Sequence, residues 1–186
     1  MSDRFDIQEV PLAGVYVLER LPRHDERGWL ERVYDTGELA GVLGTRTIAQ
    51  VNRTFAKRKG SVRGFHVQGP PSAEVKIVSC TRGAVFDVAV DLRRGSPTFA
   101  QWHAEELSEA NRRSLVIPEG FAHGFQTLAA CELLYVHTAL YDQAAERGVH
   151  ALDPQLAIPW PLEVQHLSER DASLPVLGSA FDGIVL

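Results

Sequence analysis

Turn signals recur along this chain at short intervals, and their spacing constrains the fold more than any other feature. Glycine, proline and small polar residues gather in the segments RKGS, QGPPS, TRG, RRGSPT, PEGFAHG and DPQ. Such segments form turns, because glycine and proline adopt or impose backbone angles that regular elements exclude. Only short elements fit between turns this close together, which favours many short strands over long helices.

The runs between those turns are rich in β-branched and aromatic residues, as strands are. We expect strands at residues 47–51, 75–80, 84–92, 115–117 and 133–140. Helix signals are confined to residues 36–43, which follow Asp35, and to a short turn at 109–112 behind a capping Ser108. The chain is therefore predicted to be all-β with a few short helices. Sheets with so little helix to cover them form a sandwich, a closed barrel or a jelly roll, of which we favour the jelly roll.

Size and charge narrow the classes of partner. With 186 residues, of which 45% are hydrophobic, the chain can build one sizeable core, so we expect a single domain over residues 1–186. A net charge of -5 without blocks of like charge gives no reason to expect nucleic acid or an anionic membrane as a partner. No apolar stretch could span a bilayer, and the opening MSDRFD lacks the apolar core of a signal peptide. We expect a soluble, cytoplasmic protein, with Cys80 and Cys131 as reduced core residues.

Alternation along two strands groups several polar and aromatic side chains, since every second residue of a strand faces the same way. In SVRGFHVQG, residues 61–69, this rule puts His66 on one face and Arg63 on the other. In LLYVHTALY, residues 133–141, it puts Tyr135, His137 and Tyr141 together. A polar face exposed to solvent is the ordinary explanation for one such strand. The repetition of the same mixture on several strands favours a site.

Three side chains could carry chemistry: His66, Lys76, and His123 in the glycine-flanked loop PEGFAHGF. Each also has a structural explanation. A strand histidine is more often a buried group with a hydrogen-bond partner, and a lone lysine is often an edge residue with its ammonium in water. The small neighbours of His123 suit a tight turn as well as a close approach to a ligand.

A metal centre would need two or three imidazoles and a carboxylate around one ion, and strands usually supply them as a His-x-His pair. Here Gln68 stands two residues after His66, and the nearest carboxylate, Glu74, lies beyond a Pro-Pro turn. We therefore predict no metal and no cofactor. The chain also lacks a Gly-x-Ser-x-Gly elbow, a P-loop and a dinucleotide fingerprint. The remaining histidines, lysine, tyrosines and arginines suit proton transfer next to a carbonyl.

Several long motifs, taken in order, resemble the dTDP-4-dehydrorhamnose 3,5-epimerase family, called RmlC-like. They are RGFHVQ (63–68), AEVKIVSCTRGAVFDVAVDLRRGSPTF (73–99), LVIPEGFAHGFQTL (115–128), LLYVHTALY (133–141), DPQLAIPWP (153–161) and LSERD (167–171). The resemblance implies a cupin-type jelly roll and metal-independent catalysis on a nucleotide-linked 4-keto-6-deoxyhexose. It also implies a homodimer whose subunits exchange N-terminal strands.

The catalytic roles are implied by the same resemblance. A ketone at C4 acidifies the hydrogens at C3 and C5, because the anion left behind is an enolate. His66 is then expected to be the base, oriented by Asp171, and Tyr135 the acid on the other face of the sugar. Tyr141 is the alternative acid or a ring that stacks on the nucleotide. Lys76 would stabilise the negative charge that develops on the C4 oxygen.

The resemblance also implies the residues that bind the substrate. Arg63 and Arg27 are expected to clamp the diphosphate, with Arg27 reaching in from a partner subunit. Gln50, Asn52 and His123 correspond to contacts with the sugar and phosphate.

The chain departs from the family pattern at several positions. In RGWLER, Leu30 and Arg32 replace the usual Phe and Glu, Glu74 replaces a common glutamine beside Lys76, and His137 is unusual on the strand of Tyr135. These changes keep open an epimerase that acts at C3 or C5 only. Two further alternatives are a metal-dependent cupin and a cupin that binds a sugar nucleotide without catalysis.

Overall fold

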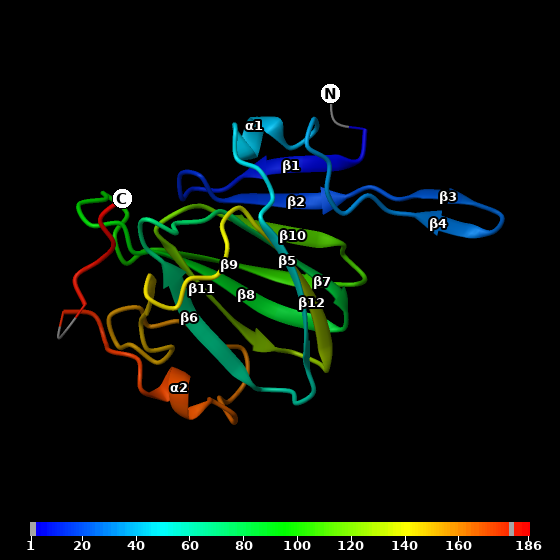
Figure 1. Ribbon diagram of the computed structural model, residues 1–186. Coiled ribbons are helices and arrows are strands. Elements are labelled where there is room, and N and C mark those ends of the chain that lie inside the picture. Colours follow the sequence, from blue (N-terminus) through cyan, green and yellow to red (C-terminus); the bar gives the residue numbers. More distant parts are fainter. Residues whose placement is uncertain (1–2, 179–180) are drawn as a thin grey trace.

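The computed structural model describes residues 3–178 and 181–186, and its regular structure is almost entirely β (Figure 1). All ladders between the named strands of these residues are antiparallel. The first sheet has six described strands, in the order β1 (Phe5–Glu9), β2 (Tyr16–Arg20), β10 (Arg113–Ile117), β7 (Lys76–Arg82), β12 (Cys131–His137) and β5 (Gln50–Ala56).

The second sheet has five described strands, in the order β13 (Glu146–Gly148), β6 (Val62–Gln68), β11 (Phe121–Thr127), β8 (Ala84–Asp91) and β9 (Trp102–Ser108). A separate hairpin of β3 (Arg23–Asp25) and β4 (Gly28–Leu30) extends away from both sheets (Figure 1). The described helices, α1 (Ala40–Leu43) and α2 (Glu169–Ala172), are short, and neither has the length to cross a membrane. The prediction of an all-β jelly roll with a few short helices is confirmed.

Most predicted elements lie close to the observed ones. Strands β7, β8, β10 and β12 confirm four of the predicted strands, and β5 begins three residues later than the predicted 47. The predicted helix at 36–43 is too long, because residues 36–39 form a turn. The Asp35 carboxylate accepts the N–H groups of Gly37 and Glu38, both at 2.9 Å, and so stabilises that turn. The turn behind Ser108 is confirmed, since the Asn111 N–H donates to its hydroxyl at 3.1 Å.

The largest hydrophobic cluster lies between the two sheets. It joins Val78, Leu115 and Leu133 of the first sheet to Val85 and Phe125 of the second. Cys80 and Cys131 are also buried there as free thiols, as predicted. Burial of this apolar surface removes it from water and holds the sheets at a fixed spacing.

Two further clusters cover the outer faces. The segment that contains α1 packs Leu39 and Leu43 against the first sheet. The C-terminal segment packs Val149, Leu156 and Leu177 against the second sheet. Both sheets are therefore fixed from both sides, which makes them a firm support for side chains that point into the space between them.

An irregularity in β6 changes which of its side chains share a face. His66 pairs with His123 of β11, whereas Arg63 pairs with Phe125, so β6 has one more residue than its partner over this stretch. Because His123 and Phe125 are two residues apart, their partners His66 and Arg63 face the same side. The prediction that Arg63 and His66 lie on opposite faces, which assumed strict alternation, is wrong.

Candidate active site

A cavity of about 830 Å³ lies between the sheets, a size typical of small-molecule sites. It contains nine of the ten predicted site residues: Gln50, Asn52, Arg63, His66, Lys76, His123, Tyr135, Tyr141 and Asp171. The tenth, Arg27, lies elsewhere. Residues separated by more than a hundred positions in sequence thus meet at one place.

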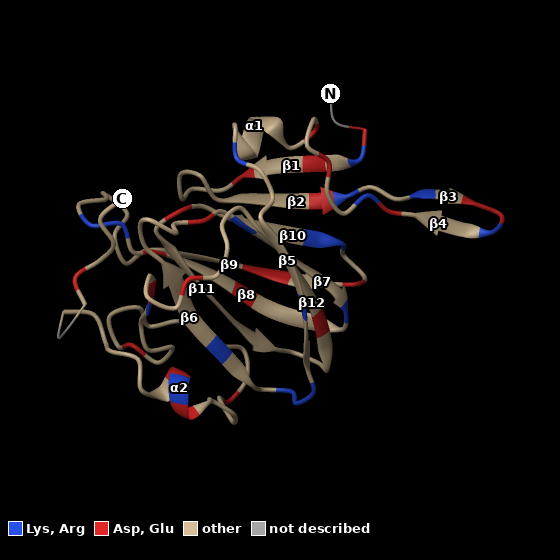
Figure 2. Cartoon of the chain, viewed as in Figure 1, with Lys and Arg blue, Asp and Glu red and all other residues tan. Residues whose placement is uncertain are grey.

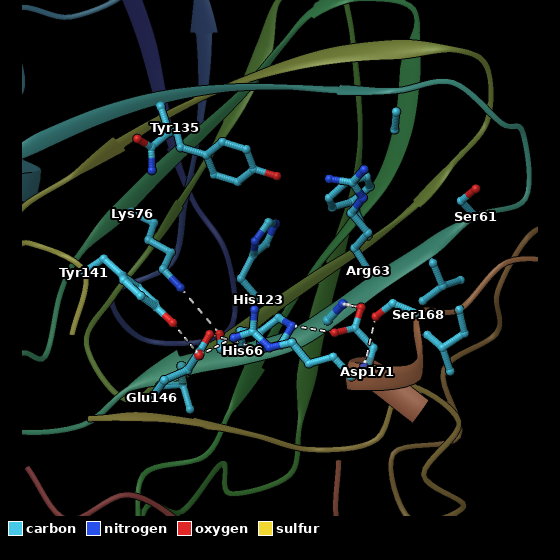
Figure 3. A pocket seen from close by; sticks show the side chains of 18 of the residues that line it. Ser61, Arg63, His66, Lys76, His123, Tyr135, Tyr141, Glu146, Ser168 and Asp171 are labelled. Atoms are coloured by element: carbon cyan, nitrogen blue, oxygen red, sulfur yellow. Dashed lines mark hydrogen bonds and ion pairs between the residues drawn. The ribbon is translucent and has the colours of Figure 1, made fainter. Parts of the chain in front are cut away.

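The two sheets supply different parts of the lining. Lys76 of β7 and Tyr135 of β12 come from the first sheet. Arg63 and His66 of β6 and His123 of β11 come from the second. In Figure 3 the ring of Tyr135 and the imidazole of His66 enter the cavity from opposite sides. A planar ligand between them could exchange protons with a different group on each face.

His66 is held by a carboxylate from the far end of the chain. Its Nε2 lies 2.8 Å from Asp171 Oδ1, and the other oxygen of Asp171 accepts the Gly64 N–H at 3.3 Å. Burial alone would raise the pKa of Asp171, but the hydrogen bonds from His66 and Gly64 outweigh it and lower the pKa. An ionised Asp171 accepts a hydrogen bond from the Nε2–H group of a neutral His66. The lone pair of Nδ1 is then available to take a proton.

Glu146 of β13 stands on the other side of the same imidazole. Its Oε1 lies 3.5 Å from His66 Nδ1, and its Oε2 accepts the Tyr141 hydroxyl at 3.0 Å and pairs with Arg170. The bond with Glu146 raises the pKa of Tyr141. The His66 imidazole thus lies between two carboxylates, Asp171 at Nε2 and Glu146 near Nδ1.

His123 lies in strand β11 and not in a loop, so that prediction is wrong. The neighbouring glycine suits the close packing of β11 against β6, since a Cβ at Gly124 would come within 2.8 Å of the Arg63 carbonyl oxygen. His123 Nε2 lies 2.7 Å from Asp87 Oδ1 of β8, and both side chains are buried. His123 thus lies between His66, its cross-strand neighbour, and Tyr135, whose ring it contacts.

Tyr135 lies among other rings. Its ring stands edge-on to His123, with centroids 5.8 Å apart, and is stacked on His137 at 5.9 Å. Burial raises the pKa of Tyr135 strongly, the charge of Asp87 acts in the same direction, and Arg63 opposes them. The phenol therefore stays protonated at neutral pH and can serve as a proton donor.

The polar groups at the rim are more exposed. The Arg63 guanidinium donates to Thr54 Oγ1 at 3.0 Å and to the Phe55 carbonyl oxygen at 3.5 Å, which uses two of its five N–H groups. Gln50 Oε1 accepts the Tyr141 N–H at 3.2 Å, which connects the loop after β12 to strand β5. Tyr141 is 55% exposed, as a residue whose ring stacks on a ligand could be.

Arg27 lies in the turn of the β3–β4 hairpin, outside the cavity. Its side chain is 83% exposed and pairs with Asp25 at 2.6 Å. Arg27 thus adds nothing to the cavity of its own chain. Its predicted reach into the cavity of a partner stays a prediction.

Three residues that hold predicted site residues in place were missed from the sequence. Asp87 carries a signal, because it is a carboxylate inside the apolar run VFDVAV of a predicted strand. Glu146 and Ser168, which caps α2 by accepting the Asp171 N–H at 3.0 Å, carry none that stands out from the surrounding loops. Within the described residues, no three His, Cys, Asp or Glu side chains are grouped so that they could hold a metal ion.

Comparison with known proteins gives a consistent set of relatives. The family model described as dTDP-4-dehydrorhamnose 3,5-epimerase matches residues 9–179. A dTDP-4-dehydrorhamnose 3-epimerase of Streptomyces niveus is 39% identical over 97% of this chain and 87% of its own length. A dTDP-4-dehydrorhamnose 3,5-epimerase of Sinorhizobium fredii is 40% identical over 94% of this chain and 91% of its own length.

Solved structures agree with the sequence relatives. The Legionella pneumophila dTDP-6-deoxy-D-glucose-3,5-epimerase RmlC, in complex with dTDP-4-keto-L-rhamnose, has a TM-score of 0.89 and 39% identity, covering 95% of this chain and 94% of its own. NovW, a 4-keto-6-deoxy sugar epimerase from the novobiocin gene cluster of Streptomyces spheroides, has a TM-score of 0.88 and 37% identity, covering 95% and 89%. Both the order of the motifs and the arrangement of the strands are thus shared over nearly the whole chain, which belongs to the dTDP-4-dehydrorhamnose 3,5-epimerase family.

Proposed function

We propose that this isomerase epimerises a dTDP-linked 4-keto-6-deoxyhexose at C3 and C5 in deoxysugar biosynthesis. The observation that carries the proposal is the opposed placement of His66 and Tyr135, one on each sheet, across a cavity of suitable size. Inversion of a carbon through an enolate requires removal of a proton from one face and its return to the other. The names of the relatives support the same substrate class.

His66 acts as the base in this scheme. Its Nδ1 takes the proton from C3 or C5, while Asp171 at Nε2 holds the ring in orientation and stabilises the imidazolium that forms. The electron pair of the broken C–H bond moves into the enolate, whose negative charge rests on the C4 oxygen. Lys76 is the cation on the first sheet that can stabilise this oxygen.

Tyr135 returns a proton to the opposite face. Its raised pKa keeps the phenol protonated until an enolate is present, and Arg63 favours the phenolate that results. Each inversion leaves His66 protonated and Tyr135 deprotonated, so both must exchange protons with solvent before the next turnover. Arg63 and Tyr141 would hold the diphosphate and base of the nucleotide, and Gln50, Asn52 and His123 the sugar and phosphate.

We also propose that the protein is a cytoplasmic homodimer that exchanges its N-terminal hairpin and binds neither nucleic acid nor membrane. Exposed Trp29 and Leu30 on the projecting hairpin, 59% and 61% accessible, support a partner surface there. Such an exchange would let Arg27 approach the partner's cavity. Basic and acidic segments are interspersed along the ribbon in Figure 2, and the longest run of basic residues in the sequence, 57–59, has three members, which supports the expectation that no polyanion is bound.

The test is incubation with dTDP-4-keto-6-deoxyglucose in deuterated water, with wash-in resolved by carbon. We expect label at both C3 and C5, and label at C3 alone would favour the 3-epimerase activity named for the Streptomyces niveus relative. His66→Ala should abolish wash-in at both carbons and keep most of the affinity for the nucleotide. If the wild type labels neither carbon, the proposed reaction is wrong.

A further inference from the structure

Three ionisable side chains form a chain of contacts at one end of the cavity. Glu74 Oε2 lies 2.8 Å from His137 Nδ1, and Glu74 Oε1 lies 3.3 Å from Lys76 Nζ. Their side chains are between 6% and 13% exposed, so the contacts are partly shielded from water. All three residues line the cavity.

The strand register explains why the carboxylate stands between the two bases. His137 of β12 and Lys76 of β7 are direct cross-strand neighbours. Two positive charges at such positions repel each other. Glu74 offers one oxygen to each, which allows an imidazolium and an ammonium to stand side by side.

The summed charge of Lys76, Glu74 and His137 acts on the C4 oxygen that Lys76 would stabilise. With neutral His137, the ammonium of Lys76 and the carboxylate of Glu74 sum to zero, and the carboxylate repels a developing enolate. With protonated His137, the three groups sum to one positive charge. Only the protonated form gives the C4 oxygen a net cation.

We propose that His137 is a positioning residue that, as an imidazolium, neutralises Glu74 and so leaves the charge of Lys76 available to the enolate. This inference rests on the proposed epimerase function. The ionisable groups that face His137 are Glu74, Lys76 and the stacked Tyr135. Asn52, whose Nδ2 lies 3.5 Å from His137 Nε2, is neutral, and beside an imidazolium its amide has to turn Oδ1 towards Nε2, because Nε2–H and the NH2 group are both donors.

The rival explanation is a structural hydrogen bond that merely holds the end of β12. A double-mutant cycle separates the two. His137→Asn keeps an N–H donor near the position of Nδ1 but cannot carry charge, and Glu74→Gln removes the carboxylate at nearly constant shape. A structural role predicts that the second change adds damage to the first, whereas the charge role predicts recovery.

The expected result is specific. His137→Asn should slow deuterium wash-in about tenfold, as befits the loss of one net charge beside the oxygen. Adding Glu74→Gln to it should restore most of that loss.

A matched control is available in His103, a partly buried histidine beside Glu105 that lies outside the cavity, with 3.7 Å between Nε2 and the carboxylate. His103→Asn should leave wash-in unchanged. A double variant no faster than His137→Asn overturns the inference. If His137→Asn fails to fold, as judged by its thermal melting, His137→Gln takes its place in the same cycle, and a double variant no faster than that single variant likewise overturns the inference. Absence of wash-in from the wild type would instead refute the proposed function.

Discussion

At the level of single residues, the proposed base and acid are held in different ways. His66 is fixed by a hydrogen bond to a carboxylate, whereas the described residues fix Tyr135 by ring contacts with His123 and His137. The sequence motif identified His66, but it could not predict the assignment of its ring nitrogens, that is, which one faces Asp171 and which one is available as the base. That assignment depends on Asp171, whose approach is set by tertiary packing over 105 positions.

Asp171→Asn tests the orienting role of the carboxylate. The amide that replaces the carboxylate can donate a hydrogen bond to Nε2. This favours the tautomer with its proton on Nδ1, which cannot act as the base, so wash-in should fall on the order of 10³-fold. The control is Asp153→Asn, which changes another buried aspartate, hydrogen-bonded to the Leu177 N–H at 2.6 Å outside the cavity. It should lower the melting temperature without a comparable loss of rate. Equal rate losses in both variants would contradict an orienting role for Asp171.

Tyr135→Phe tests the acid. The ring contacts remain and only the proton donor is lost, so formation of inverted product should fall more than wash-in does. Product analysis and deuterium content measured on the same samples give the ratio. An equal loss of both would point to Tyr141 as the donor or to a binding role for Tyr135.

At the level of elements, the turn spacing predicted five of the thirteen described strands, β5, β7, β8, β10 and β12, but it could not predict the extra residue in β6. That irregularity depends on the pairing with β11 and brings Arg63 and His66 onto one face. The same holds for the helix predicted at 36–43, where local hydrogen bonds to Asp35 compete with helix formation. Patterns along the sequence report local preference, whereas register is decided between strands.

Gly64→Ala tests the close approach of β6 and β11. Gly64 has a φ of +112°, and a Cβ there would lie 2.6 Å from Gly124 Cα. We expect a loss of about 3 kcal/mol in the free energy of unfolding, from the backbone conformation and the overlap together. Gly41→Ala, in helix α1 with nothing within 4 Å, should be neutral or slightly stabilising. Denaturant titration measures both, and equal stabilities would contradict the steric argument.

The end of strand β8 carries a pH-dependent contribution to stability. Burial alone would raise the pKa of Asp91, but hydrogen bonds from Arg93 and Ser96 outweigh it and lower the pKa from 3.8 to about 2. A lowered folded-state pKa stabilises the protein above the unfolded-state pKa, and this contribution is lost as pH falls through the folded-state value. Asp91→Asn should therefore cost about 2 kcal/mol at neutral pH and little near pH 2. A difference that stays constant over acid unfolding curves would exclude this origin.

At the level of the whole molecule, the resemblance of ordered motifs predicted the family, and with it the meeting of nine residues in one cavity. The placement of Arg27 could not be predicted from turn spacing or alternation. The hairpin extends away from its own sheets and leaves Trp29 and Leu30 largely exposed, which makes it the surface to test for the proposed dimer.

Trp29→Ser combined with Leu30→Ser tests the hairpin as a dimer contact. Both side chains are exposed in the single chain, so the fold should persist while the mass in solution falls to that of a monomer. Light scattering coupled to size exclusion gives the mass. Leu152→Ser, another exposed leucine at 51%, should have no effect on assembly. A dimer that survives the double change would place the contact elsewhere.

The division of the proposed base and acid between two sheets bears on which component would move during catalysis. The strands that carry His66 and Tyr135 are anchored by buried apolar clusters, so we expect their backbones to stay in place. The hexose would then have to rotate or change its pucker to present C5 after C3. Whether one or both centres invert is then decided by the freedom left to the bound sugar, and residues that narrow the space around it would select the stereochemistry without contributing a proton.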